Sequence, residues 1–309
     1  MKKFICAVLA VVLLAFAPLG AACQPTDPTT TTFRIMEKLP FATPSGYEKL
    51  TYDYTRTQPD SGTVVENGTV VMEAYYGSEQ TELRITEKIY DTASGLLLFE
   101  SASSVTMATV GLYPRLSSKT VKVYNPKNLE NFADSSYTVS ADYSAKTSSG
   151  SIAGKAQNAI TIPDIGVNCF DNEQLFYLVR SATNLETLEN TGTFDLANMA
   201  DSYFSEKFYK HEMIYSVLET ATVSTEKLQN AASLGLGEAV PCYKISLKIN
   251  SNKSGPGTVL YISDQAFTSG ETVLSDRVIM KMVREQYDVN TFVMTYVHEY
   301  VLSSYSASL

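Results

Sequence analysis

Ser224 and Lys227 have the spacing Ser-x-x-Lys, in which penicillin-binding enzymes carry a nucleophilic serine and a lysine that helps to deprotonate it. The companion patterns Ser-Asp-Asn and Lys-Thr-Gly do not occur downstream. A serine here also suits the N-cap of a helix with charged residues in its first turn. We therefore expect a helix from Ser224 to about Ala232, with Ser224 as its cap rather than as a nucleophile.

The chain has two histidines, and neither occurs in a recognisable catalytic or metal-binding pattern. The Gly-x-Ser-x-Gly turn of serine hydrolases is absent, and a zinc site needs three or four ligands. His211 is expected at a solvated strand edge. His298 shares a predicted strand face with Tyr296 and Tyr300, so these three are expected either to line an apolar pocket or to pack the core. No metal and no cofactor are expected.

The first 22 residues have the features of a secretory signal peptide: Lys2 and Lys3, an apolar run, and a small-residue exit. Gly20-Ala21-Ala22-Cys23 resembles the bacterial lipobox, although Gly20 stands where leucine is usual. That resemblance implies cleavage before Cys23 and a diacylglycerol on its thiol. The alternative is an ordinary signal peptide, with Cys23 left as a plain thiol.

Cleavage before Cys23 leaves 22 basic and 33 acidic residues, a net charge of −11. This charge argues against nucleic acid and against an anionic membrane surface as partners. The expected partners are a membrane reached through the lipid anchor and either a lipid-like ligand or an envelope protein.

Two cysteines remain beyond the anchor, Cys169 and Cys242. An extracytoplasmic compartment would allow a disulfide between them. We favour two buried thiols that act as small hydrophobic side chains.

Residues 23–45 are rich in proline and threonine and are expected to form a flexible tether. From residue 46 onward, apolar and polar residues alternate with the period of half-buried strands. Asn67-Gly68 is expected to form the turn of a hairpin over residues 63–72. Residues 194–210 are expected to hold a second, less regular helix.

The clearest helix of the sequence is expected at 171–182. Asp171 is suited to be its N-cap, and Gln174 completes a capping box. Its apolar residues fall on one helical face, which is expected to plug a curved sheet: Leu175, Phe176, Leu178, Val179 and Ala182.

About a dozen short strands and two or three helices predict a mainly β (α+β) protein. We expect a large curved antiparallel sheet or half-open barrel with one central helix and one or two further helices. Residues 46–309 are expected to form a single domain, with two lobes, 46–167 and 183–309, on either side of the helix at 171–182.

Three stretches resemble a bacterial envelope family known only as a domain of unknown function, of the 3108 type. They are the acidic-start, arginine-ended helix Asp171–Arg180, the strand and Ser-Asp turn of Thr258–Asp264, and the terminal strand at 290–302. The resemblance covers the C-terminal half. It implies a curved sheet around helices, similar to the half-open barrel of bacterial lipoprotein carriers, and it carries no active site.

We therefore expect a lipid-anchored protein on the extracytoplasmic face of the cell membrane or the outer membrane. Its role is expected to be non-enzymatic, in binding or in envelope interactions. Two alternatives stay open. One is a cell-wall or carbohydrate-directed hydrolase, whose paired carboxylates sequence spacing does not reveal. The other is a solute-binding lipoprotein of a transporter.

Overall fold

The computed structural model describes residues 31–32, 46–124, 136–166, 168–182, 185, 191–250, 257–288, 291 and 293–308. Within them, sixteen strands form one sheet in the order β1-β11-β12-β13-β14-β17-β18-β2-β3-β4-β5-β6-β7-β8-β9, with β10 paired to β11 off this path. Two further strands, β15 and β16, form a separate hairpin. The prediction of a mainly β protein built on a large antiparallel sheet is confirmed.

The bounds of the strands follow in chain order: β1 Thr31–Thr32, β2 Gly46–Thr57, β3 Val64–Tyr76, β4 Gln80–Asp91, β5 Leu97–Ala108, β6 Pro114–Val123, β7 Tyr137–Asp142, β8 Thr147–Ile152, β9 Lys155–Ala156, β10 Cys169–Asp171, β11 Thr191–Ala197, β12 Lys210–Ser224, β13 Ala239–Ile249, β14 Thr258–Ser263, β15 Phe267–Ser269, β16 Thr272–Ser275, β17 Ile279–Tyr287 and β18 Met294–Ser308.

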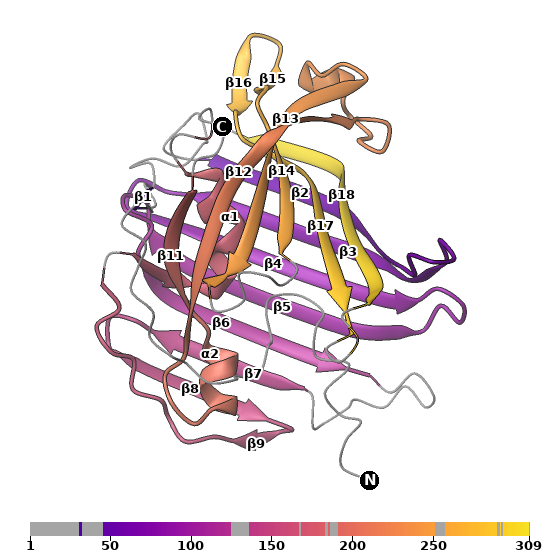
Figure 1. The fold of residues 1–309 in the computed structure, drawn as a ribbon. Helices are drawn as coiled ribbons and strands as arrows, with labels where there is room; N and C mark the ends of the chain where they lie inside the picture. Colours follow the sequence, from indigo (N-terminus) through magenta and orange to yellow (C-terminus); the bar gives the residue numbers. More distant parts are fainter. Residues whose placement is uncertain are drawn as a thin grey trace.

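The sheet has two halves that meet where β18 pairs with β2 (Figure 1). Strands β2 to β9 form the first half, and β11 to β14 with β17 and β18 cross over it as the second half. Neighbouring strands are antiparallel, except that β1 and β10 run parallel to β11. Helix α1, Leu175–Arg180, lies between the two halves.

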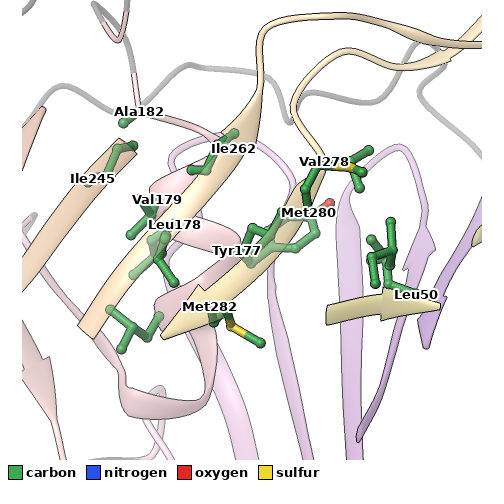
Figure 2. Close-up of a cluster of buried hydrophobic side chains, with 14 of the residues drawn as sticks. Leu50, Tyr177, Leu178, Val179, Ala182, Ile245, Ile262, Val278, Met280 and Met282 are labelled. Carbon is green, nitrogen blue, oxygen red and sulfur yellow. The ribbon is translucent and has the colours of Figure 1, made fainter. Parts of the chain in front are cut away.

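Helix α1 fills the concave side of the sheet, as its apolar face predicts. Figure 2 shows Leu178 and Val179 directed towards Ile245, Ile262 and the methionines of β17. Leu178 and Val179 are fully buried, whereas Phe176 is only half-buried. The helix is shorter than predicted, because a 3-10 turn, Asn172–Gln174, precedes it and the chain leaves the helix after Arg180.

The hairpin turn predicted at Asn67-Gly68 is wrong. Both residues lie within the continuous strand β3, between β2 and β4. The glycine serves a close backbone approach instead, because a Cβ at Gly68 would lie 2.2 Å from the carbonyl oxygen of Lys88. An Asn-Gly pair therefore indicates a turn only where its backbone is not hydrogen-bonded to neighbouring strands on both sides.

Two other predicted helices also differ. Residues 194–210 hold the end of β11, helix α2 at Met199–Phe204, and the first residue of β12. The expected helix after Ser224 is a series of turns that ends in the 3-10 turn Ala232–Leu234. Gly235 terminates this turn in the left-handed conformation, with φ 72°.

The signal peptide at 1–22 and Cys23 lie outside the described residues. Of the expected tether, Thr31 and Thr32 form strand β1, which pairs with Gly192 and Thr193 of β11. Among the described residues, no helix combines the length and the apolar character needed to span a membrane.

Candidate functional site

A buried ion pair fixes the end of α1 to the first half of the sheet. The Arg180 guanidinium donates to both carboxylate oxygens of Glu48 on β2, at 2.7 and 2.9 Å. It also donates to the Ser275 hydroxyl at 3.0 Å and to the Arg277 carbonyl at 2.5 Å. Glu48 is 0% exposed and Arg180 is 3% exposed. Burial alone lowers the pKa of Arg180, but the charge and hydrogen bonds of Glu48 outweigh this effect and raise it well above its usual value.

Two tyrosines complete the coordination of Glu48. The Tyr305 hydroxyl donates to one carboxylate oxygen at 3.1 Å, and the Tyr76 hydroxyl donates to the other at 3.2 Å. The carboxylate therefore receives four hydrogen bonds from strands β3 and β18 and from α1. These four hydrogen bonds offset the free-energy cost of burying the Glu48 charge in a low-dielectric interior.

The space left between α1 and strands β2 to β4 is small. Its volume is about 30 Å³, and its walls include Leu50, Met72, Phe176 and the Glu48–Arg180 pair. One water molecule needs roughly 10–15 Å³ of such space, whereas sites for small organic ligands start at roughly 300 Å³. The helix therefore occupies the place that a lipid-like ligand would need on the concave side.

A second buried charge cluster lies at the start of the same helix. Lys119 on β6 donates to Glu173 at 2.9 Å, and both side chains are nearly inaccessible. Glu87 on β4 is 1% exposed, accepts from Ser101 at 3.4 Å, and has one carboxylate oxygen with no partner among the described residues. Burial raises the pKa of Glu87 to about 8, so its carboxyl is largely protonated at neutral pH.

Asp171 is the helix cap that the sequence predicts. Its side chain accepts from the Glu173 backbone, and the Gln174 side chain accepts from the Asp171 backbone, each at 2.8 Å. The Tyr143 hydroxyl adds a third contact, at 2.5 Å. Burial raises the pKa of Asp171 to about 6 despite these hydrogen bonds.

His298, which the sequence places beside Tyr296 and Tyr300 on one strand, is 0% exposed. Its Nδ1 lies 2.9 Å from the Tyr54 hydroxyl, and its Nε2 lies 3.0 Å from the Gln286 side-chain oxygen. Burial lowers the pKa of His298 to about 2, so the ring is neutral. When Nε2 donates to Gln286, the neutral ring can accept a hydrogen bond from the Tyr54 hydroxyl at Nδ1. His298 thus links β18 to both neighbouring strands, β2 and β17.

The two tyrosines beside it on the strand have separate environments. The Arg56 guanidinium stacks 3.7 Å from the centre of the Tyr296 ring, and the Tyr300 ring packs 5.0 Å from that of Tyr54. Both side chains are half-buried. An apolar pocket lined by Tyr296, His298 and Tyr300 stays a prediction.

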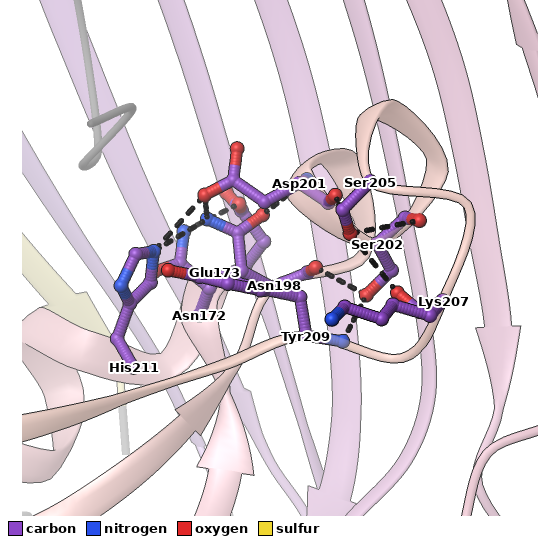
Figure 3. Close-up of polar contacts among 9 residues, drawn as sticks. All are labelled: Asn172, Glu173, Asn198, Asp201, Ser202, Ser205, Lys207, Tyr209 and His211. Atoms are coloured by element: carbon purple, nitrogen blue, oxygen red, sulfur yellow. Dashed lines mark hydrogen bonds and ion pairs between the residues drawn. The ribbon is translucent and has the colours of Figure 1, made fainter. Parts of the chain in front are cut away.

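His211 also forms a structural contact. Figure 3 shows it beside Asp201 and Asn198, at the start of α2. Its Nε2 lies 3.0 Å from an Asp201 carboxylate oxygen, and Asn198 caps the helix by accepting from the Asp201 backbone at 3.1 Å. His211 is buried, so its predicted position at a solvated edge is wrong. Among the described residues, no three His, Cys, Asp or Glu side chains are grouped as metal ligands.

Ser224 caps a turn, because its hydroxyl accepts from the Glu226 backbone at 3.2 Å. It lies with Lys227 in an outer groove of about 300 Å³, formed where the end of β12 faces β14, β17 and β18. Tyr261 and Lys281 are paired neighbours across its floor. Its lining comprises Thr222, Val223, Ser224, Glu226, Lys227, Tyr261, Lys281, Glu299 and Val301.

The charges of this groove are only partly matched. Lys281 and Glu299 form an ion pair at 2.5 Å across β17 and β18. Lys227 is exposed and forms no ion pair or hydrogen bond with any residue that the structure describes. The groove thus combines an aromatic ring, hydroxyl groups, ammonium donors and carboxylate acceptors on one surface.

Cys169 and Cys242 are free, buried thiols, so the disulfide alternative is not formed. They belong to different regions of the core, Cys169 on β10 and Cys242 on β13. Burial raises the pKa of each thiol to about 12, which suppresses the reactive thiolate.

The buried charges were missed by sequence reasoning, although strand alternation marks them. Glu48 shares its face with Leu50 and Tyr52, and Glu87 shares its face with Ile85 and Ile89. A charged residue at an inward position of an otherwise apolar stripe is the signal that would have found both.

No family model and no curated protein match the sequence. A β-barrel-like protein of domain of unknown function DUF1849 from Brucella abortus matches in structure, with a TM-score of 0.50, 10% identity, and coverage of 86% of this chain and 99% of that chain. A provisionally assigned lipoprotein from Parabacteroides distasonis ATCC 8503 has a TM-score of 0.33 at 10% identity, over 87% and 99% of the two chains. The likeness to the DUF1849 protein shows a common fold and nothing about activity.

Proposed function

We propose that this chain is a lipid-anchored protein of the bacterial cell envelope, on the extracytoplasmic face of its membrane, that binds envelope glycan through the outer groove. The groove at Tyr261 carries the proposal, because its volume of about 300 Å³ reaches the range of small-ligand sites. The concave side, by contrast, is filled by α1.

The lining of the groove suits a polyhydroxylated ligand. The Tyr261 ring offers an apolar face for a sugar ring, and the Thr222 and Ser224 hydroxyls both donate and accept hydrogen bonds. Lys227 supplies an ammonium donor that forms no hydrogen bond or ion pair with the residues that the structure describes, and Glu299 supplies carboxylate acceptors. Mixed charges balance one another, which favours a neutral or zwitterionic sugar over a strongly charged polymer.

Anchoring rests on the lipobox resemblance at Cys23. Cys23→Ala should release the protein from membranes in cell fractionation. Membrane retention of that variant would refute the anchor and leave the groove untouched.

Binding is tested by co-sedimentation with purified cell-wall sacculi. Tyr261→Ala should lower the bound fraction several-fold, because it removes the platform for the sugar ring. Tyr287→Ala is the matched control, since Tyr287 lies at the end of β17, the strand next to β14, and outside the groove lining. Equal binding by wild type and Tyr261→Ala would refute the glycan site.

Carbohydrate-directed hydrolysis is a second candidate, favoured by the presence of two carboxylates, Glu226 and Glu299, in the same groove. The sedimentation assay distinguishes the two, because hydrolysis would release soluble saccharides with time. Release that Glu299→Gln abolishes would replace the binding role with a catalytic one.

A further inference from the structure

Three exposed apolar side chains gather on the β5–β6 hairpin. Val110 is 62% exposed, Tyr113 is 42% exposed and Leu116 is 51% exposed, all within seven residues of sequence. We propose that this hairpin tip, residues 109–116, rests on the lipid bilayer as a second membrane contact beside the acyl anchor. The proposal rests on the proposed anchoring at Cys23.

The backbone of the tip is held in a conformation that turns one apolar residue inward and leaves another outside. Gly111 and Leu112 both adopt left-handed conformations, with φ 78° and 56°. A left-handed leucine is costly, and such strain persists only where the surroundings enforce it. Here the Leu112 side chain is 0% exposed and its carbonyl accepts from Gln174 at 2.8 Å.

Further hydrogen bonds tie the tip to the neighbouring turn. The Thr109 hydroxyl donates to the Gly77 carbonyl at 2.7 Å, and the Thr109 backbone donates to the Glu79 carbonyl at 3.1 Å. The Ala108 backbone donates to the Tyr113 carbonyl at 2.9 Å. Val110 is therefore presented on a rigid support and is not simply part of a loose loop.

The tip lies at the same end of the sheet as Gly46, the first residue of β2. Pairing from strand to strand connects Gly46 of β2 to Tyr76, Tyr76 to Thr81, Thr81 to Met107, and Met107 to Pro114 of β6. Four strand spacings separate Gly46 from the tip, a distance of about 19 Å. Figure 1 shows strands β2 to β6 lying side by side.

The tether keeps the fold close to the bilayer. Because Thr31 pairs with Gly192, only the 31 − 23 = 8 residues from Cys23 onward are left to span the gap, at most about 29 Å when fully extended. A fold tethered this closely to a bilayer presents its exposed apolar side chains to the lipid at high effective concentration.

The chemistry of the tip suits a lipid headgroup region. Ser101 to Pro114 contains no charged residue, and the first charge beyond it is the cation Arg115. Tyrosine prefers the membrane interface, where its ring is apolar and its hydroxyl is hydrated. The turn at the opposite end of the same sheet, residues 92–96, follows Asp91 and exposes Thr92, Ala93 and Ser94 instead.

The chain has no tryptophan, so a single substitution creates a unique fluorescent reporter. We would place Val110→Trp in the full lipidated protein and reconstitute it into zwitterionic phosphatidylethanolamine–phosphatidylcholine vesicles, with and without brominated acyl chains. Ala93→Trp, at the opposite end of the same sheet, is the matched control. The reporter at 110 should shift to the blue and be quenched several-fold more strongly than the control.

Each outcome decides between the proposals. Equal quenching of the two reporters in vesicle-bound protein overturns the tip contact while the anchor stands. A wild-type protein without an acyl chain, or one that floats with vesicles after Cys23→Ala, overturns the anchor. A blue shift at 110 that appears without vesicles and rises with protein concentration assigns the tip to a second copy of the chain and also overturns the bilayer contact.

Discussion

Arg180→Met removes one partner of the buried ion pair that clamps α1 to the sheet. The substitution keeps an unbranched apolar stem but deletes two hydrogen bonds to Glu48, one to Ser275 and one to the Arg277 carbonyl. Glu48 is left as a buried charge with only its two tyrosine donors. Breaking a buried pair in this way costs about 3–5 kcal/mol.

The measurement is urea unfolding followed by far-UV circular dichroism, as a double-mutant cycle with Glu48→Met. Each single variant should lose several kcal/mol, and the double variant should lose much less than the sum, because no lone charge remains in the core. The surface pair Arg84–Glu82, at 2.8 Å, is the control, and breaking it should cost far less because solvent screens it. If Arg180→Met costs no more than the control, the clamp does not exist as described.

Leu178→Asp should prevent folding, because it places a charge at a fully buried position of α1; native-like circular dichroism would show that the helix is peripheral. The pKa of Glu87, raised from 4.5 to about 8, means that the folded protein holds a proton that the unfolded chain releases near pH 4.5. Stability should therefore fall between about pH 4.5 and pH 8, by roughly 1.4 kcal/mol per unit, and Glu87→Gln should flatten this fall in urea unfolding measured across that range. Cys169 and Cys242 should react with a maleimide only in denaturant, and rapid labelling of the native protein would contradict their burial.

Local patterns predicted the fold class and the central helix well. The capping box of Asp171 and Gln174 and the burial of Leu178 follow from residue spacing alone, and the structure shows both. The Asn67-Gly68 turn failed because its role is set by the carbonyl of Lys88, a contact between strands that local sequence does not encode.

The ion pairs of the core also depend on contacts that local sequence does not encode. Glu48 and Arg180 come from distant parts of the chain, so no spacing rule connects them. In the sequence, each of the two resembles an ordinary surface residue. Only the position of Glu48 on the inward, apolar face of β2 indicates that it is buried. The outer groove likewise joins Ser224, Tyr261 and Glu299 through the strand order, which sequence periodicity leaves undetermined.

The pairing of β18 with β2 has a kinetic consequence. Ser308 lies opposite Tyr47, so the two central strands of the sheet come from opposite ends of the chain. Such a high contact order makes folding slow, because the closing contact must wait for the last strand to emerge. Until then β2 keeps an unpaired edge that invites aggregation. A protein of this topology is suited to a route on which the whole chain is delivered before it folds, and one that is truncated near its C-terminus should aggregate rather than lose one edge strand.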